Sequence, residues 1–381
     1  MSGPLDGLRI IEFAGLGPAP FAGMMLSDAG ADIIRIDRHD RATYPPQVHP
    51  HVDLMNRGRR SVAVDLKHAD GVDLVLRLID QADGLVEGFR PGVAERLGVG
   101  PDVCMERNPR LVYGRMTGWG QSGPLATTAG HDIDYISVAG ALEAVGRAGQ
   151  PPLPPLNLVG DFGGGGMLLA FGMVSGILSA QKTGEGQVID AAMVDGAAAL
   201  MTMIYTLRQT GTWQDVRGTN LLDTGAPFYE VYETADGKFM SVGAIEFQFY
   251  AELIRLLGLE NEDLPDQNDR TQWPKMKERF ASLFLTKTRD EWQEIFDGTD
   301  ACVSPVLSIP EAAEHPHNRF RGTFTEVAGV VQPGPAPRFG GTPGSIQRPP
   351  PNPGQHGDEA LADWGIEPEA IAKVRAAGAI T

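Results

Sequence analysis

The amino-acid sequence predicts an α/β protein with a Rossmann-like open parallel sheet in a large domain, followed by a smaller α+β domain. Short apolar runs alternate with helix-like segments in the first half of the chain, as they do in βαβ units. A hairpin pattern and a group of helical segments follow in the second half. The length of 381 residues also exceeds what one hydrophobic core usually holds, so two domains are expected.

The large domain is predicted to begin with one βαβ unit. An apolar strand at 8–13 and a turn at 15–20 lead into a helix at 21–29 and a second strand at 31–36. The same alternation continues, so we expect an open parallel sheet with helices on both faces. The further predicted elements are strands at 62–64, 84–86 and 111–115 and a helix at 71–81.

The second half of the chain has a different pattern. Residues 187–209 are rich in Ala, Met and Leu and predict a helix that leads out of the large domain. Residues 229–243 are typical of a hairpin, and a Pro- and Gly-rich connection lies at 332–354. Helices are predicted at 248–257, 273–285, 289–296 and 367–376. The predicted organisation is a large α/β domain at 1–190, linker helices at 191–228, a small α+β domain at 229–315 and a return to the large domain at 316–381.

Composition and charge exclude several classes of function. A formal net charge of −17 argues against a nucleic-acid partner and an anionic membrane surface, because both require a broad basic face. Cys104 and Cys302 lack metal-ligand spacing, and His315 and His317 have no third ligand nearby, so no metal site is expected. The apolar run at 167–180 is shorter than the roughly 20 residues that span a bilayer and predicts a buried helix. No export signal is recognisable, so a cytoplasmic location is expected.

The glycine-containing turn after the first strand resembles a dinucleotide-binding loop, but its residues match that loop poorly. Gly15 and Gly17 fit a glycine-rich phosphate loop, and Asp37 ends the second strand at a suitable distance. Pro20 occupies the position of the third glycine and lacks the amide N–H that a pyrophosphate would use. We therefore interpret this segment as a structural βα turn.

Basic residues are concentrated at 57–67 in an otherwise acidic chain. Such a local excess suits a phosphorylated ligand. Further arginines lie at or just beyond the ends of predicted strands, where open α/β sheets bind their ligands. Solvated surface arginines without a ligand are the alternative. The basic residues concerned are Arg57, Arg59, Arg60 and Lys67 in the segment, and Arg38, Arg90 and Arg96 near the strand ends.

Two further segments have residues suited to catalysis. His131 opens a predicted helix at 130–142, where unpaired N–H groups could stabilise a developing oxyanion; a structural histidine is the alternative. Asp161 is followed closely by four consecutive glycines, 163–166, and then by an apolar helix. Four glycines cost conformational entropy, which favours a close backbone approach over the alternative of a flexible loop.

A series of short motifs in fixed order extends over nearly the whole chain and resembles family III CoA-transferases. The residues that resemble the family are 7–12, 30–32, 35–38, 56–61, 65–67, 88–92, 117–124, 160–161 and 184–187. Within the family, segments 130–132, 157–166 and 243–246 resemble the bacterial α-methylacyl-CoA racemases. The sequence departs from the pattern around 43–51 and at Phe89 and Phe162, which bears on the length of the acyl chain more than on the reaction.

The resemblance implies a racemase that interconverts (2R)- and (2S)-2-methylacyl-CoA thioesters through an enolate. Removing the α-proton from one face and delivering a proton to the other requires a base and an acid of similar pKa. His131 and Asp161 match this pair, and the main-chain N–H of Asp132 is expected to stabilise the enolate oxygen. Glu246 matches the acid that orients the histidine from the other subunit of an interlocked homodimer.

The resemblance also implies that CoA enters as part of an acyl-CoA thioester substrate, with no separate cofactor. Positions that match the CoA contacts of the family are Arg38, Val64, Lys67, Gly88, Phe89, Arg90, Arg96, Gly130, Tyr135 and Asn157.

Three other functions remain as alternatives. A CoA-transferase that moves CoA between carboxylic acids would use Asp161 as a nucleophile and pass through an aspartyl-CoA intermediate, although such transferases lack the counterpart of His131. A non-catalytic acyl-CoA-binding protein would bind CoA esters without exchanging their α-proton. A nicotinamide dehydrogenase would depend on the turn that contains Pro20.

Overall fold

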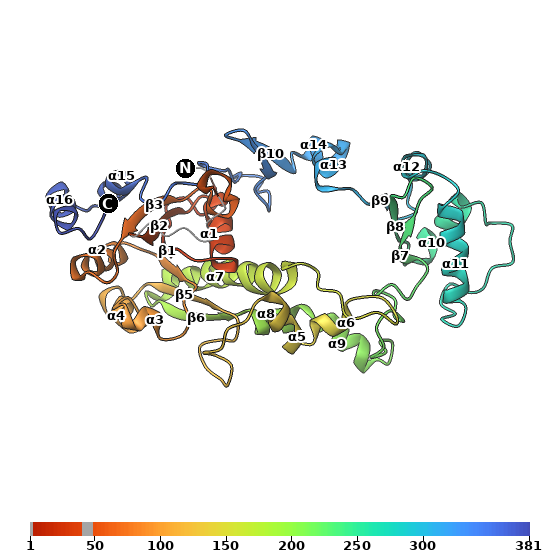
Figure 1. Cartoon of the computed structure of the whole chain (residues 1–381), viewed down its shortest axis with the longest axis horizontal. Coiled ribbons are helices and arrows are strands. Elements are labelled where there is room, and N and C mark those ends of the chain that lie inside the picture. Colours follow the sequence, from red (N-terminus) through yellow and green to blue (C-terminus); the bar gives the residue numbers. More distant parts are fainter. Residues whose placement is uncertain (1–2, 40–48) are drawn as a thin grey trace. The chain divides into compact units, whose positions relative to one another are not determined.

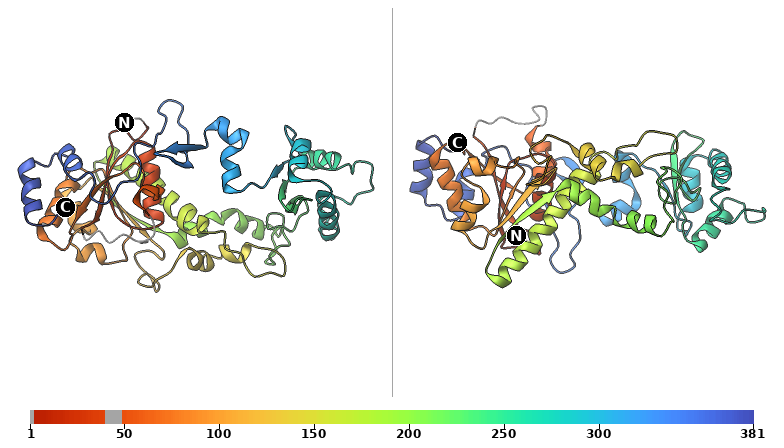
Figure 2. Two further views of the ribbon diagram at one scale, coloured as in Figure 1. Left: turned by 45° about the horizontal axis from the view of Figure 1, so that its top comes forward. Right: turned by 90° about the horizontal axis from the view of Figure 1, so that it is seen from below.

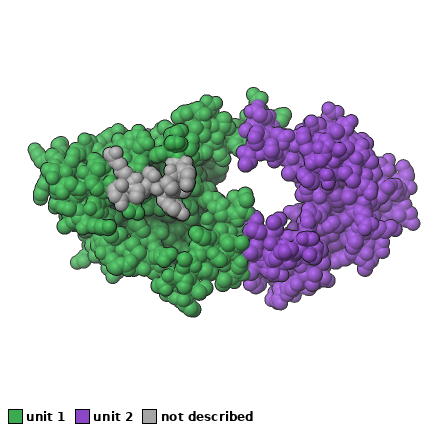
Figure 3. Space-filling view, viewed as in Figure 1, with its two compact units in different colours: residues 1–139, 156–200, 316–381 green, residues 140–155, 201–315 purple. Residues whose placement is uncertain are grey.

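The structure is a computed structural model that describes residues 3–39 and 49–381 (Figure 1). Most of the divergent stretch predicted around 43–51 therefore lies outside the described residues. The chain forms two compact units, which Figure 3 shows in separate colours. Unit 1 contains Met1–Ala139, Leu156–Leu200 and Pro316–Thr381, and unit 2 contains Gly140–Pro155 and Met201–His315.

Unit 1 is built on a six-stranded parallel sheet with the order β3-β2-β1-β4-β5-β6. The chain moves outward from β1 in one direction and then returns to continue on the other side through β4. The strand order therefore reverses between β1 and β4, and open α/β sheets bind ligands beyond the carboxyl ends of the strands at such a point. The strands are β1 (Arg9–Phe13), β2 (Asp32–Arg38), β3 (Arg60–Val64), β4 (Gly84–Glu87), β5 (Val112–Thr117) and β6 (Gln187–Ala192).

Helices cover both faces of this sheet, as predicted (Figures 1 and 2). Alternate residues of β1 point to opposite faces, so Ile10 and Ile11 belong to different hydrophobic cores. The core around Ile10 contains residues of α1 (Pro18–Asp28) and α7 (Leu168–Thr183). The core around Ile11 contains residues of α2 (Ala69–Ile79), α4 (Pro101–Arg107), α15 (Gly357–Asp363) and α16 (Pro368–Ala376).

The prediction of one helix over residues 187–209 is wrong at its start. Residues 187–192 form β6, which pairs with β5 along its whole length. The helices α8 (Met193–Leu200) and α9 (Thr202–Gln209) follow. In this edge strand only Ala192 is buried, so its apolar pattern is weak and the helix-favouring Ala and Met residues that follow dominate the sequence signal.

The segment with four glycines forms η3 (Leu158–Met167), a π-helix that continues into α7. A Cβ added at Gly164 would lie 2.6 Å from the backbone nitrogen of Ala197 in α8, and one at Gly165 would lie 3.0 Å from Pro18 Cβ in α1. The glycines are thus explained by close helix packing, as expected, and the flexible-loop alternative does not hold. π-helical turns are rare and frequently occur at functional sites.

The three arginines of segment 57–67 do not face a ligand, which corrects the prediction made for them. Arg59 donates to the buried carboxylate of Glu12 at 3.0 Å, and Arg57 donates to Asp28 at 2.5 Å. Arg60 contacts Asp32 at 2.6 Å. The partners come from β1, α1 and β2, so the pairing depends on contacts that the local sequence does not reveal. Because removing one partner of a buried ion pair costs about 3–5 kcal/mol, these arginines stabilise the fold.

Within residues 3–39 and 49–381, one helical stretch is long and apolar enough to cross a membrane by length and composition, namely Leu158–Thr183. It extends beyond the predicted apolar run at 167–180 because η3 and α7 are continuous. Leu169, Met173 and Ile177 lie in the hydrophobic core beneath the sheet. A core helix of a globular domain passes the same test, so this stretch is weak support for a membrane span.

Unit 2 contains a three-stranded antiparallel sheet formed by β7 (Tyr229–Glu233), β8 (Phe239–Gly243) and β9 (Val303–Pro305), which confirms the predicted hairpin. The buried carboxylate of Glu230 binds Arg147 at 2.7 Å and Lys277 at 2.8 Å. Residues 140–155 therefore group with this unit, although the predicted large domain at 1–190 included them. The helices packed around the sheet are α10 (Phe247–Leu256), α11 (Trp273–Phe284) and α12 (Arg289–Phe296).

The remaining elements are short. They are η1 (Pro50–Val52), η2 (Leu54–Asn56), α3 (Val93–Arg96), α5 (Asp132–Val138), α14 (Pro316–Arg321), β10 (Phe324–Val327) and β11 (Val330–Pro333) in unit 1, and α6 (Ala141–Ala144) and α13 (Ile309–Glu314) in unit 2.

The substitution Gly164→Ala tests the packing of η3. The new methyl group would meet the backbone of α8, which cannot move aside as a flexible side chain can. We expect a loss of about 1–3 kcal/mol in the free energy of unfolding, measured by urea denaturation. Gly172→Ala in α7 is the matched control, because its Cβ would meet only the side chain of Ile189 and alanine favours helix. Equal stability of the two variants would contradict the packing account.

Candidate functional site

Two cavities lie beyond the carboxyl ends of the parallel strands, one on each side of the strand reversal. The first, of about 280 Å³, is lined by residues that follow β1, β2 and β3. The second, of about 240 Å³, is lined by residues that follow β1, β4 and β5. Phe89 lines both cavities, so they are neighbours at the place where this sheet topology favours a ligand.

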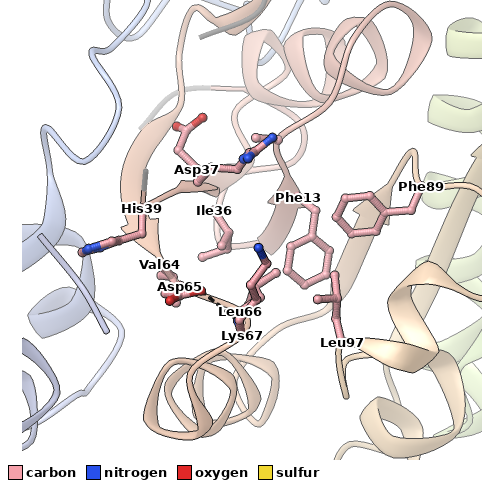
Figure 4. Close-up of a pocket in the computed structure, with 12 residues that line it drawn as sticks. Phe13, Ile36, Asp37, His39, Val64, Asp65, Leu66, Lys67, Phe89 and Leu97 are labelled. Atoms are coloured by element: carbon pink, nitrogen blue, oxygen red, sulfur yellow. Dashed lines mark hydrogen bonds between the residues drawn. The ribbon is translucent and has the colours of Figure 1, made fainter. Parts of the chain in front are cut away.

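The first cavity combines an aromatic wall with two cations, and the carboxylates of Asp37 and Asp65 also line it (Figure 4). The rings of Phe13 and Phe89 lie with centroids 5.6 Å apart, and Leu97 lies beside them. Arg38 and Lys67 line the same cavity from the ends of β2 and β3. Among the described residues, the amine of Lys67 has no hydrogen-bond or ion-pair partner, so it is available to an anion. The cavity therefore suits a ligand with a flat ring and phosphate groups.

The loop after β4 is fixed by the carboxylate of Glu87. Glu87 is fully buried and accepts hydrogen bonds from the N–H of Phe89 at 2.5 Å and from Arg115 Nε at 2.9 Å. Burial raises the pKa of Glu87, while these two donors oppose the shift. The bond to the Phe89 amide sets the path of the chain through Gly88, so that Phe89 and Arg90 both line the second cavity.

His131 and Tyr135 enter the second cavity from α5. His131 is the N-cap residue of this helix, and its backbone N–H donates to the carboxylate of Asp134 at 2.9 Å. The Tyr135 hydroxyl donates to the carbonyl of Gly130, and its ring packs edge-on against Trp119. Burial raises the pKa of Tyr135 to about 12, so the phenol remains neutral near pH 7. The helix start thus holds an exposed imidazole at the cavity wall.

Asp161 lies on η3 and is half-buried. Its backbone N–H donates to Asp132 Oδ2 at 2.7 Å, and its own carboxylate accepts from Asn157 Nδ2 at 3.1 Å. Burial raises the pKa of Asp161, and the like charge of Asp132 raises it further. Asn157 and the electrostatic influence of His131 act in the opposite direction. The carboxyl is therefore biased toward its protonated form while it interacts with the imidazole.

The turn after β1 connects Asp161 to the second cavity. Leu16 and Pro18 line this cavity. Between them, Gly17 has φ 67°, a left-handed conformation that favours glycine, and an added Cβ would lie 3.6 Å from Asp161 Oδ2. Asp161 itself is not among the lining residues of that cavity. It lies behind the turn, and sequence reasoning, which treated the turn as purely structural, missed that Leu16 and Pro18 belong to the site.

The structure brings most of the predicted site residues to these cavities. Asn157, predicted as a CoA contact, lines neither cavity and donates to the Asp161 carboxylate. Arg96 is exposed at the end of α3 and lines neither cavity. The predicted residues that line the first cavity are Arg38, Val64, Lys67 and Phe89, and those that line the second are Gly88, Phe89, Arg90, Gly130, His131 and Tyr135.

Glu246 belongs to unit 2, where it is the exposed N-cap residue of α10. The backbone before it is held by the largely buried side chain of Gln267, which donates to the carbonyls of Ala244 at 3.3 Å and Ile245 at 2.8 Å. The amide of Gly243 donates to the carbonyl of Cys302 at 2.8 Å. The Glu246 carboxylate accepts no hydrogen bond from the residues that the structure describes, so it is free to bind a group outside unit 2.

Further lining residues of the second cavity were not predicted as site residues. Met116, Trp119 and Met193 belong to this set. The motif at 117–124 was a signal for Trp119, but a motif match alone does not indicate which of its residues face a ligand. No group of three or more His, Cys, Asp or Glu side chains able to hold a metal ion occurs within residues 3–39 and 49–381.

The site chemistry can be stated from this geometry. The Asp161 carboxyl, whose pKa is raised, and the exposed imidazole of His131 interact electrostatically beside the second cavity. The first cavity, with its aromatic side chains and its cations, lies next to it. The first amide of α5, that of Asp132, stands at a helix N-terminus, where backbone N–H groups favour negative charge. Such a set of groups can bind a phosphorylated ligand and move protons on its reactive end.

Comparison with known proteins agrees with this arrangement. The chain is 46% identical over 370 residues to α-methylacyl-CoA racemase from Mus musculus and 45% identical over 370 residues to that from Homo sapiens, covering 96% of this chain and 95% of each relative. A CAIB/BAIF family protein from Brucella suis has the same fold, with a TM-score of 0.79 at 23% identity over 96% of this chain and 100% of the other. A family model described as CoA-transferase family III matches residues 5–357, and the chain therefore belongs to that family.

Proposed function

We propose that the chain is an α-methylacyl-CoA racemase that interconverts (2R)- and (2S)-2-methylacyl-CoA thioesters. The observation that carries the proposal is the pair formed by His131 at the start of α5 and Asp161 on η3, in a chain that is similar over nearly its full length to two racemases. The two cavities at the strand ends support an acyl-CoA as the substrate, since one suits an adenine and phosphates and the other contains His131.

The proposed reaction moves one proton off the α-carbon and another onto it. In one direction neutral His131 takes the α-proton and protonated Asp161 delivers a proton to the opposite face; in the other direction the two exchange roles. The raised pKa of Asp161 supports this scheme, because burial favours the protonated carboxyl that the acid role requires. The Asp132 main-chain N–H would stabilise the enolate oxygen by about 3 kcal/mol, a value typical of one oxyanion donor.

Glu246 is proposed to accept a hydrogen bond from the His131 ring and so to raise its basicity. We further propose that it does so from the partner subunit of an interlocked homodimer. The exposed Glu246 carboxylate, which the described part of the chain leaves without a donor, supports this. Apolar side chains along η3 and α7 support a dimer as well, since Leu158, Phe171 and Leu178 are 56%, 70% and 50% exposed.

CoA is proposed to bind by local cations and not by a basic surface. Lys67 and Arg38, which line the first cavity, and Arg90, which lines the second, are proposed to contact phosphates, and Phe13 and Phe89 to contact the adenine. Arg96 stays a predicted contact. A cytoplasmic location also stays part of the proposal.

Incubation with a (2R)-2-methylacyl-CoA in deuterium oxide tests the proposed reaction. We expect incorporation of deuterium at the α-carbon and appearance of the 2S epimer, followed by mass spectrometry and chiral chromatography. His131→Ala and Asp161→Ala should each lower the rate of epimer formation by about 10²–10⁴-fold, the usual contribution of a general acid or base. His317→Ala, which removes an exposed histidine of α14, is the control and should keep the full rate.

A different outcome would favour the transferase alternative. If no α-proton exchanges for several acyl chain lengths, while an added free carboxylic acid acquires CoA, the chain is a CoA-transferase. In that case an aspartyl-CoA thioester on Asp161 should be trapped and located by peptide mass spectrometry.

The substitution Lys67→Ala tests the proposed phosphate contact. Loss of one charge-assisted hydrogen bond should weaken CoA binding about tenfold, measured by calorimetry, and the difference should shrink at high salt. The free energy of unfolding should change by less than about 0.5 kcal/mol, because the side chain is exposed. Lys182→Ala on α7 is the control for loss of a surface charge. An unchanged affinity for CoA in Lys67→Ala would exclude the contact.

A further inference from the structure

The side chain of Asp132 connects the two elements that contain His131 and Asp161. Asp132 is the first residue of α5, directly after His131, and is only 5% exposed. Its Oδ2 accepts the backbone N–H of Asp161 on η3 at 2.7 Å. A single carboxylate thus ties the helix start that contains the imidazole to the π-helix that contains the carboxyl.

The residue before Asp161 makes this contact possible. A Cβ at Gly160 would lie 2.6 Å from Asp132 Oδ2, so any side chain at that position would displace the carboxylate. The second oxygen of Asp132, Oδ1, is buried and has no hydrogen-bond partner among the described residues. A buried carboxylate with one unpaired oxygen is costly, and local strain of this kind is often retained where function needs it.

The charge of Asp132 also acts on Asp161. Its carboxylate is the like charge that raises the pKa of Asp161, in addition to burial. From α5, His131 and Tyr135 also interact electrostatically with Asp161. The other titratable side chains on elements packed against η3 are Asp134 of α5, which accepts the His131 N–H, Asp28 of α1, which binds Arg57, Lys182 near the end of α7, Asp195 of α8, Tyr113 and Arg115 of β5 and Asp190 of β6.

We infer that the Asp132 carboxylate is a positioning residue that holds His131 and Asp161 in the spacing needed for two-base proton transfer. This assignment rests on the proposed racemase function and adds a second task for Asp132, distinct from that of its main-chain N–H. The side chain acts through Asp161 and does not need to touch the substrate.

Two substitutions separate the hydrogen bond from the charge. Asp132→Asn keeps an oxygen that can accept the Asp161 N–H but removes the negative charge. Asp132→Ala removes both. The measurements are kcat and KM for racemisation across pH, the Kd for CoA and the thermal unfolding temperature. Asp195→Asn is the matched control, because it removes one exposed carboxylate from a helix packed on η3 without touching Asp161.

Asp132→Ala should lower kcat about 10²-fold, the effect of a small misplacement of reacting groups, with little change in KM or in the Kd for CoA. Asp132→Asn should recover most of kcat. The acidic limb of the kcat/KM profile reports the coupled titration of His131 and Asp161. In Asp132→Asn this limb should move to lower pH, because loss of the neighbouring negative charge lowers the pKa of Asp161. Asp195→Asn should leave the limb in place.

Either of two results would overturn the inference while the wild-type protein still racemises its substrate. One is a lower kcat/KM of Asp132→Asn at every pH with its acidic limb unmoved. That result would mean that Asp132 contributes only to the stability of the fold. The other is wild-type kcat in Asp132→Ala. Absence of racemisation in the wild-type protein would instead refute the proposed function itself, so the two failures are distinguishable.

Discussion

Close backbone packing of η3 against α1 and α8 is the constraint on which the site depends. The glycines of η3 let the backbones of these helices approach to a distance that any side chain would prevent, as the position of a Cβ at Gly164 demonstrates. This packing holds Asp161 behind the turn at Gly17 and next to α5. The same approach at Gly160 admits the Asp132 carboxylate. Loss of this close packing would therefore displace the Asp161 carboxyl, even if the residues that line the cavities stayed in place.

The distribution of charge explains how an acidic chain can hold an anionic ligand. The net charge is −17, yet the first cavity has Arg38 and Lys67 on its lining. The three arginines in segment 57–67 form ion pairs with the internal carboxylates of Asp28, Glu12 and Asp32. These pairs tie the start of β3 and the residue before it to β2 and β1.

Much of the fold was predictable from the sequence because β1 to β5 are buried strands whose branched apolar residues give a clear signal. The edge strand β6 and the π-helix η3 were not, since tertiary packing and not local propensity determines them. His131 and Asp161 could be proposed as the catalytic pair from the motifs, but the sequence does not reveal that Arg59 pairs with Glu12, because Glu12 lies far away in the chain. The contribution of Leu16 and Pro18 to the second cavity likewise depends on the fold.

The central claim is that His131 and Asp161 act on opposite faces of one α-carbon. The most direct measurement is α-proton exchange in deuterium oxide with each pure epimer, using the His131→Ala and Asp161→Ala variants. The account predicts that each variant exchanges the α-proton of one epimer only, that the two variants differ in which epimer this is, and that neither forms the opposite epimer at an appreciable rate. Exchange of both epimers by either variant would contradict the account, because one remaining group would then serve both faces.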